Sequence, residues 1–381
     1  MKEFKISIHQ DIHFGENSIN LIGEIINGEK VKKVFVVSDR GLEKVGIVKK
    51  VINILEKKGI EYSLFLDVEP NPTHLTVEAG VIKFNDSQAD SILAVGGGST
   101  LDASKAIAII ATFGGKITDY EGAHTVPGPI IPFFAIPTTA GTGSEVTPAA
   151  VITDKDTDWK FSVYDFKLVP KHVFLDPTLL VGLPPHVAAS TGMDALVHAI
   201  EAYISLNADS FSDACAEKAM ELIGKNIRLF VANRENIEAA GNMILGSMFA
   251  GMAFARAKLG NIHAMSHPVS AYFGVAHGVA NSILLPIILE FNSLADTGRY
   301  EKIYNYIKKN ETNELFKPSM LINEIYDLLH EFSIPTKLSD VGVNIEKIDL
   351  MCRDSLRSSN VLTNPRNTTY EDIKNLFMKA I

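Results

Sequence analysis

Short apolar runs alternate with helical patterns along the first half of the chain. The runs predict strands over residues 31–39, 62–66, 92–95, 130–136 and 173–176, and residues 4–14 also have an extended pattern. Between them, helical spacing predicts helices over residues 41–59 and 74–85, the second capped by Thr73, and another from near Leu101. Residues 147–173 predict a hairpin-like excursion. Strands that alternate with helices indicate an α/β fold with a parallel sheet covered on both faces.

The strand patterns stop after Pro177, and the rest of the chain has helical patterns only. These patterns predict helices over residues 188–205, 211–231, 235–259, 268–273, 279–291, 299–309, 317–332, 345–358 and 370–380. We therefore predict two domains, an α/β dinucleotide-binding domain over residues 1–177 and an all-helical domain over residues 178–381.

Two glycine-rich polar loops follow predicted strands, where open α/β sheets bind their ligands. The first is Gly96-Gly97-Gly98-Ser99, and the second covers residues 137–144. Glycines let a phosphate approach the backbone at the start of the next helix, where the helix dipole favours negative charge. The alternative is a tight strand-to-helix turn without a ligand. No Gly-x-Gly-x-x-Gly motif follows the first strand, and Lys105 lies too far along its helix to act as a Walker lysine.

Asp39 ends the predicted strand 31–39, where an acid commonly holds a ribose 2′-hydroxyl. An acid at a strand end is also often a solvated loop residue, and this position alone does not choose between the two.

Five residues of the helical half have the spacing of metal ligands. His263 and His267 lie four apart, as do Asp194 and His198, and His277 follows ten residues after His267. Carboxylate and imidazole suit a divalent metal. A buried histidine can equally be a core residue, and spacing alone does not say which three histidines would bind. Pro268 follows His267 directly, and we expect it to end or kink the helix that carries His263 and His267.

Composition narrows the class of protein. The net charge of −9 and the lack of a basic tract argue against a nucleic-acid partner or an anionic membrane. The N-terminus lacks the apolar core of a signal peptide, and no apolar run approaches the ~18 residues of a membrane span. Two cysteines, Cys215 and Cys352, make no disulfide framework, and Cys215 fits a core position. We expect a cytoplasmic enzyme.

Together, and in this order, the motifs resemble the iron-containing (group III) alcohol dehydrogenase family. They are residues 96–102, 137–145, 194–201, 260–278 and 363–366, the last reading Thr363-Asn364-Pro365-Arg366. The resemblance implies a Rossmann-like N-terminal domain and a helical C-terminal domain, the dehydroquinate synthase-like fold. It also implies NAD as cofactor and Fe²⁺ as the metal, although Zn²⁺ suits the same donors.

Matched residue by residue, the resemblance assigns a role to each candidate. The metal ligands would be Asp194, His198, His263 and His277, and His267 would be a catalytic residue near the nicotinamide. Asp39 would contact the adenosine ribose of the cofactor, and Asn71 would lie near the nicotinamide, whose ribose Lys160 would contact. The pyrophosphate would be held by Gly97, Gly98 and Ser99, and the adenosine and ribose side would be lined by Thr138, Thr139, Thr142 and Ser144. The substrate pocket would include Phe254 and Leu259.

The resemblance predicts hydride transfer between NAD(H) and a small aliphatic alcohol or aldehyde. Other interpretations stay open: a glycerol dehydrogenase-like polyol oxidoreductase, a 3-dehydroquinate synthase, or a non-catalytic metal- or nucleotide-binding protein. The synthase would need a basic cluster, but residues 250–280 contain only Arg256 and Lys258. The family also often forms homodimers, and the strand over residues 4–8 is a candidate for pairing across one.

Overall fold

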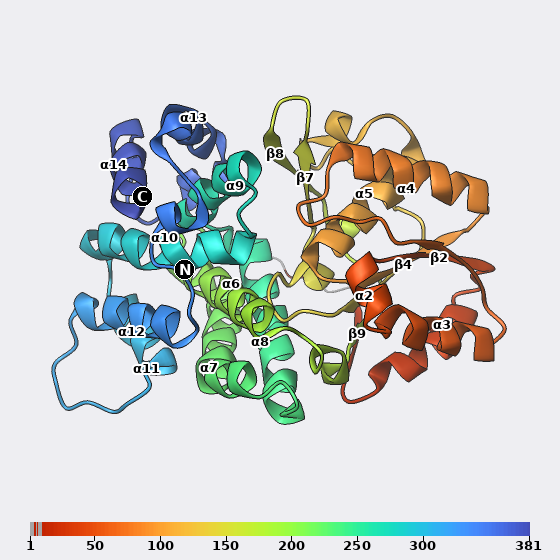
Figure 1. The fold of residues 1–381 in the computed structure, drawn as a ribbon, viewed down its shortest axis with the longest axis horizontal. Helices are drawn as coiled ribbons and strands as arrows, with labels where there is room; N and C mark the ends of the chain where they lie inside the picture. Colours follow the sequence, from red (N-terminus) through yellow and green to blue (C-terminus); the bar gives the residue numbers. More distant parts are fainter. Residues whose placement is uncertain (1–3, 5, 7–9) are drawn as a thin grey trace. The chain divides into compact units, whose positions relative to one another are not determined.

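The computed structural model describes Phe4, Ile6 and residues 10–381 (Figure 1). The chain forms two compact units. Among the described residues, one contains the chain from Ile6 to Thr139 together with Ser144–Gly182, and the other contains Phe4, Ala140–Gly143 and Leu183–Ile381. Because residues 5 and 7–9 lie outside the described part, so does the expected pairing of residues 4–8.

The first unit contains a six-stranded sheet in the order β1-β9-β6-β4-β2-β3, with every neighbouring pair parallel. This confirms the predicted sheet. Its strands are β1 (Asp11–Phe14), β2 (Lys33–Val37), β3 (Glu61–Phe65), β4 (Ser91–Gly96), β6 (Phe133–Pro137) and β9 (His172–Leu175). The central strands β4 and β6 are buried throughout because helices cover both of their faces, and almost all of their residues are apolar.

The helices of this unit lie on both faces of the sheet: α4 and α5 on one side, and α3 on the other (Figure 1). Their bounds are α1 (Ile22–Gly28), α2 (Arg40–Lys44), α3 (Ile47–Lys57), α4 (His74–Ser87) and α5 (Gly98–Phe113). The prediction of one helix over residues 41–59 was wrong: Gly46, at φ 85°, separates α2 from α3, in a left-handed conformation that glycine adopts without steric cost. The Thr73 cap is confirmed, since its hydroxyl accepts the Thr76 N–H at 3.3 Å.

A second, small sheet has the order β5-β8-β7. Strands β7 (Ala149–Asp154) and β8 (Trp159–Tyr164) form an antiparallel hairpin, which confirms the predicted excursion. Strand β5 (Gly122–Ala123) pairs parallel with β8 and is too short to give an alternating pattern. The 3-10 helices of this unit are η1 (Ser18–Leu21), η2 (Ile117–Tyr120), η3 (Ser144–Val146), η4 (Phe166–Leu168) and η5 (Pro177–Leu180).

The second unit is helical, as predicted, and α6, α7 and α8 pack against one another at its centre. Its helices are α6 (Pro185–Ile204), α7 (Ser210–Ala232), α8 (Ile237–Ala257), α9 (Asn261–Phe273), α10 (His277–Asn292), α11 (Arg299–Ile307), α12 (Pro318–Glu331), α13 (Ile348–Arg357) and α14 (Tyr370–Ala380). The 3-10 helices are η6 (Ser293–Ala295), η7 (Leu338–Val341), η8 (Ile345–Lys347) and η9 (Ser359–Thr363).

We expected Pro268 to end or kink its helix, and the first of these two alternatives was wrong. Helix α9 continues through this buried proline as far as Phe273. A proline inside a helix removes one backbone hydrogen bond at a cost of about 3 kcal/mol. Because most residues between Asn261 and Ser270 are buried, packing of α9 offsets that cost.

Two helices of this unit are long and apolar enough to cross a membrane, Ile237–Ala257 and the segment His277–Ala295. We expected no apolar run of this length, and both helices escaped that expectation because polar residues interrupt their apolar runs. In each, 61% of the most apolar window is buried inside the fold. We therefore interpret both segments as core helices, with the metal-ligand candidate His277 at the start of the second.

Candidate metal centre and cofactor loops

Helix α6 carries two of the candidate ligands on one face. Asp194 and His198 lie one turn apart and are 3% and 4% exposed. The His198 Nδ1 lies 4.0 Å from Asp194 Oδ2, and it also lies 3.3 Å from the carbonyl oxygen of Gly141. The apolar residues of α6 bury both side chains, so the carboxylate needs a compensating partner.

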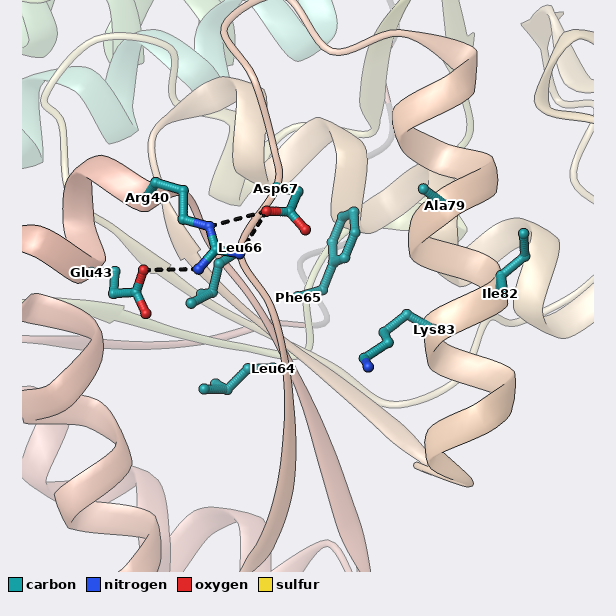
Figure 2. A pocket seen from close by; sticks show the side chains of 9 residues that line it. All are labelled: Arg40, Glu43, Leu64, Phe65, Leu66, Asp67, Ala79, Ile82 and Lys83. Carbon is teal, nitrogen blue, oxygen red and sulfur yellow. Dashed lines mark hydrogen bonds and ion pairs between the residues drawn. The ribbon is translucent and has the colours of Figure 1, made fainter.

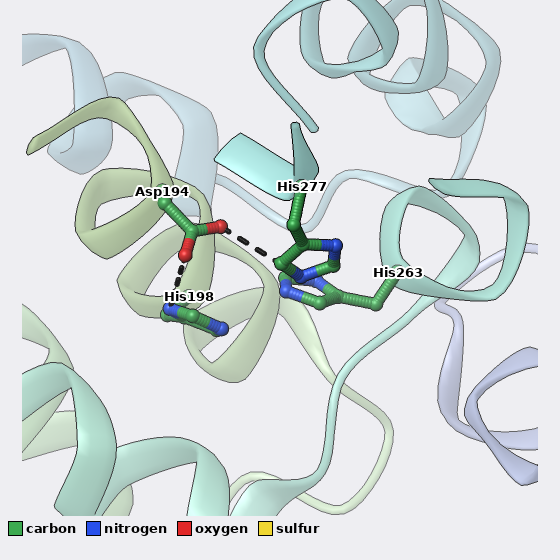
Figure 3. A group of neighbouring side chains, drawn as sticks. All are labelled: Asp194, His198, His263 and His277. Carbon is green, nitrogen blue, oxygen red and sulfur yellow. Dashed lines mark ion pairs between the residues drawn. The ribbon is translucent and has the colours of Figure 1, made fainter. Parts of the chain in front are cut away.

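Helices α9 and α10 bring the other two candidate ligands to the same point. His263 is in the first turn of α9, and His277 is the first residue of α10. Gly278 permits this approach, because a Cβ there would lie 2.3 Å from the carbonyl oxygen of Ser190 in α6. One ligand atom from each of the four residues lies within 4.8 Å of the others, and the side chains converge (Figure 3).

The Asn281 amide lies among these atoms and indicates how the histidines are protonated. Its Nδ2 is 2.7 Å from Asp194 Oδ1 and 3.1 Å from the Nε2 atoms of both His263 and His277. The reverse amide orientation would place oxygen against a carboxylate, so nitrogen must face the cluster. An amide NH₂ group only donates hydrogen bonds. Because this nitrogen cannot accept a hydrogen bond, its position favours a lone pair on the Nε2 atoms that face it.

The donor set fits a divalent cation. Three imidazole rings and one carboxylate converge from three helices, and the carboxylate and two of the rings are almost fully buried. Nitrogen lone pairs with one carboxylate suit Fe²⁺, Zn²⁺ and similar metals. A bound cation would also neutralise Asp194, which no lysine or arginine ion-pairs in the described part of the chain.

His267, Phe254 and Leu259 lie around this cluster. The ring of His267 is 6.3 Å from that of His263 and 5.5 Å from that of His277, outside the four converging side chains. Phe254 stacks on His198 with centroids 4.5 Å apart. Leu259 lies in the connection between α8 and α9, and its carbonyl oxygen accepts the Thr363 hydroxyl.

The glycine loop lies at the carboxyl end of β4, and Gly97 is the residue before the first turn of α5. Strand order reverses between β2 and β4, which is where open sheets bind nucleotides. Asn71, in a left-handed conformation at φ 54°, donates its N–H to Ser99 Oγ at 3.3 Å. Lys160 Nζ donates to Asn71 Oδ1 at 3.1 Å. The fold thus gathers Ser99, Asn71 and Lys160 from three distant segments.

Known proteins are similar to this chain over almost its whole length. Residues 9–177 match the model of the iron-containing alcohol dehydrogenases, and residues 188–381 match the C-terminal model of the same family. The chain is 38% identical to the 1,3-propanediol dehydrogenase of Klebsiella pneumoniae, with 96% of each chain covered. It is 35% identical to the NAD-dependent methanol dehydrogenase of Bacillus methanolicus, covering 96% of this chain and 97% of that one. A solved 1,3-propanediol oxidoreductase superposes with a TM-score of 0.95 at 37% identity, covering both chains fully.

The chain belongs to the iron-containing alcohol dehydrogenase family. It is a metal-dependent oxidoreductase that interconverts alcohols and aldehydes with NAD(H) as its cofactor. This sets aside the non-catalytic interpretation and the synthase.

The second loop of this alcohol dehydrogenase divides between the two units. Thr138 donates its N–H to the Gly96 carbonyl at 3.1 Å. The side chain of Thr139 packs closely against Gly97, since a Cβ added at Gly97 would lie 3.3 Å from it. Thr142 belongs to Ala140–Gly143, which packs with the helical unit.

Ser144 has partners that the sequence did not suggest. Its hydroxyl donates to Asp102 Oδ1 at 2.6 Å and accepts from Lys105 Nζ at 2.9 Å. The Lys105 ammonium is fully buried and also donates to the carbonyl oxygens of Ser144, Thr147 and Ala149. It therefore holds the segment after the loop in place. In the sequence, a lysine within an otherwise apolar helix was the feature that could have predicted this buried interaction.

Asp39 follows β2 and caps α2, since its Oδ1 accepts the Leu42 N–H at 2.9 Å. Next to it, Arg40 is held by Asp67 Oδ1 at 2.9 Å and Glu43 Oε2 at 3.1 Å. Figure 2 shows these contacts at the rim of a surface pocket of about 620 Å³, which also has apolar residues of β3 and α4 in its wall. The guanidinium is therefore already paired.

Sequence reasoning also missed Glu201 and Asn281. Glu201 lies on α6 seven residues after Asp194, and Asn281 lies on α10 four residues after His277. Both spacings put a polar group on the ligand-bearing face of an apolar helix. This pattern could have identified Glu201 and Asn281 as site residues from the sequence. Burial raises the pKa of Glu201 to about 7, opposed by backbone N–H donors at Ile262 and Gly260.

Proposed function

We propose that Asp194, His198, His263 and His277 bind Fe²⁺ and form the catalytic centre. The observation that supports this most directly is the convergence of one ligand atom from each within 4.8 Å. The metal would supply Lewis acidity toward the alcohol or aldehyde oxygen. Iron is proposed because of the family, since the donor set alone also suits Zn²⁺ and Mn²⁺.

The chain's own residues would orient the substrate and handle the proton. The substrate would lie in an apolar environment formed by Phe254, which stacks on His198, and by the buried Leu259. His267 lies beside the ligands without being one, and imidazole titrates where it can exchange a proton near neutral pH. The proton released when an alcohol is oxidised would pass to His267 or to water.

The cofactor would bind at the reversal point of strand order. Gly97, Gly98 and Ser99 would receive the pyrophosphate at the N-terminus of α5. Asp39 would hold the adenosine ribose, with Thr138, Thr139, Thr142 and Ser144 on the adenosine side. Lys160 and Asn71, already hydrogen-bonded, would face the nicotinamide ribose. Since Ser144 is occupied by Asp102 and Lys105, its contribution would be to position the loop.

For the substrate we propose small aliphatic alcohols and aldehydes, in keeping with relatives named for propanediol and methanol. An apolar pocket distinguishes chain lengths by only ~1–3 kcal/mol per methylene, so activity over several chain lengths is expected. A polyol substrate such as glycerol is the second candidate. We also propose a cytoplasmic location, consistent with two free buried cysteines in the described part, and a homodimer or larger homo-oligomer.

The test combines a substrate screen with metal analysis. Absorbance at 340 nm would be followed with short alcohols, diols, glycerol and their aldehydes, using both NAD(H) and NADP(H). Metal content would be measured on protein purified without oxygen. Near-stoichiometric iron with activity on short aldehydes supports the proposal. Full activity with stoichiometric zinc would overturn iron, and glycerol preferred over monoalcohols would favour the polyol enzyme.

A further inference from the structure

Glu201 is a buried carboxylate that reaches from α6 to the start of α9. It is 2% exposed, and its Oε2 lies 2.6 Å from Nδ1 of His263. Its Oε1 accepts the N–H of Ile262 at 2.8 Å, and the N–H of Gly260 is a further donor. Both oxygens are therefore occupied by groups at the N-terminus of one helix, where negative charge is favoured.

The contacts on the two sides of the His263 ring agree on its tautomer. On one side, Asn281 can only donate, so Nε2 must carry the lone pair. On the other side, the N–H groups of Ile262 and Gly260 favour the ionised form of Glu201, and a carboxylate only accepts, so Nδ1 carries the hydrogen. Both contacts fit the Nδ1–H form, with Nε2 directed at the cluster of Asp194 and His277.

The backbone is shaped around this carboxylate. A Cβ at Gly260 would lie 2.9 Å from Glu201 Oε1 and 3.1 Å from Asn364 Oδ1, so a side chain there would displace these groups. The Asn364 side chain accepts the N–H of Asn261 at 3.3 Å and therefore holds the same helix end through a different residue. Replacing Asn364 should therefore loosen this helix end without removing Glu201, which makes an Asn364 variant a matched control.

We propose that Glu201 is the positioning residue of the metal centre: by accepting the Nδ1–H of His263 it fixes the tautomer and ring orientation that present Nε2 to the metal. This rests on the proposed four-residue metal site. A carboxylate behind a ligating histidine raises the basicity of the ligand, and its loss typically costs 10- to 100-fold in metal affinity.

The first measurement uses the unmodified enzyme loaded with zinc, which is diamagnetic. Nitrogen-15 NMR of the histidine rings, with the His263 signal assigned by its absence from a His263→Gln variant, shows which ring nitrogen carries hydrogen. We expect a hydrogen on Nδ1, shifted downfield by the carboxylate, and metal on Nε2. Metal on Nδ1 with hydrogen on Nε2 would overturn the proposal without any change at Glu201.

The second measurement compares how fast the loaded enzymes lose metal to excess chelator, and the metal Kd by competition. For Glu201→Gln we expect Kd to rise 10- to 100-fold, because one amide cannot accept from both His263 and the α9 N–H groups. Glu201→Asp should recover part of the affinity. Asn364→Ala should lower the melting temperature and change Kd by less than threefold.

Each outcome decides a separate question. If Asn364→Ala weakens metal binding as much as Glu201→Gln, the effect is loosening of the helix end, and the proposal fails. If Glu201→Gln binds metal like the unmodified enzyme, it also fails, while the proposed function stands. If the unmodified enzyme itself binds no metal, the proposed function fails first.

Discussion

The phenyl ring of Phe254 stacks on the imidazole of His198 with centroids 4.5 Å apart and planes inclined by 22°. Phe254 is in the last turn of α8, whereas His198 is in α6. One face of a candidate metal ligand is therefore covered by an aromatic ring. This contact connects the proposed substrate pocket with the metal centre.

Replacing Phe254 by Ala should enlarge the pocket and loosen His198. We expect kcat/KM for methanol and ethanol to fall by about tenfold, while that for hexanol falls less, because a longer chain fills part of the space left by the ring. Steady-state kinetics over a series of primary alcohols would measure this. A uniform loss across the series would mean that Phe254 supports His198 without lining the pocket.

Single replacement of Asp194, His198, His263 or His277 by Ala should remove bound metal and activity. The expectation follows from the four converging donor atoms, since three remaining ligands bind a divalent cation more weakly. Metal analysis and NADH fluorescence titration would be run together, because the cofactor should still bind. A variant with full metal content and rate would show that its residue is not a ligand.

Changing His267 to Ala should have a different signature. Its ring lies 5.5 Å from that of His277 and outside the ligand cluster, so metal content should be unchanged. Turnover should fall by 10²- to 10⁴-fold if imidazole relays the proton, and the pH profile of kcat should change shape. Unchanged turnover across the pH range would remove His267 from the proton path.

Replacing Asp39 should change the preference between NAD and NADP. A 2′-phosphate within ~4 Å of this carboxylate would be repelled by a few kcal/mol, roughly a hundredfold preference for NAD. Arg40 would not rescue it, since Asp67 and Glu43 already hold its guanidinium.

Two variants separate the charge of Asp39 from its cap. Asp39→Asn can still accept the Leu42 N–H, whereas Asp39→Gly loses this cap. We expect both to raise the NADP/NAD ratio of kcat/KM, and only Asp39→Gly to lower the melting temperature. An unmodified enzyme that uses both cofactors equally would identify Asp39 as a helix cap only.

Glu145 should make stability depend on pH. Burial raises its pKa to about 7, opposed in part by the Lys105 ammonium. The folded state thus holds this proton more tightly than the unfolded chain, whose glutamate titrates near 4.3. Its stabilising contribution is complete below that value and is lost as pH rises through about 7.

The comparison is Glu145→Gln against the exposed Glu314→Gln as control. Between pH 4.5 and 7.5, the free energy of unfolding of Glu145→Gln should rise relative to the unmodified protein by up to about 3 kcal/mol. Denaturant titrations at several pH values would measure it. Parallel pH profiles for all three proteins would show that Glu145 titrates normally.

The sequence by itself determined most of the elements and the chemistry of the candidate ligands. Strands β2, β4 and β6 are recognisable because a strand buried on both faces must be apolar throughout. The pairs Asp194–His198 and His263–His267 are recognisable because residues four apart share a helix face. The proposed domain boundary near Pro177 stays a prediction from the same patterns.

Only the tertiary structure decided which groups meet across elements. Nothing in the spacing shows that His267 lies outside the cluster that His277 joins, or that Glu201 reaches His263 from another helix. The continuation of α9 through Pro268 depends on packing that outweighs a local cost. Secondary structure follows from local steric preference and burial periodicity, whereas hydrogen-bond partners distant in sequence depend on how whole helices pack, which no short window contains.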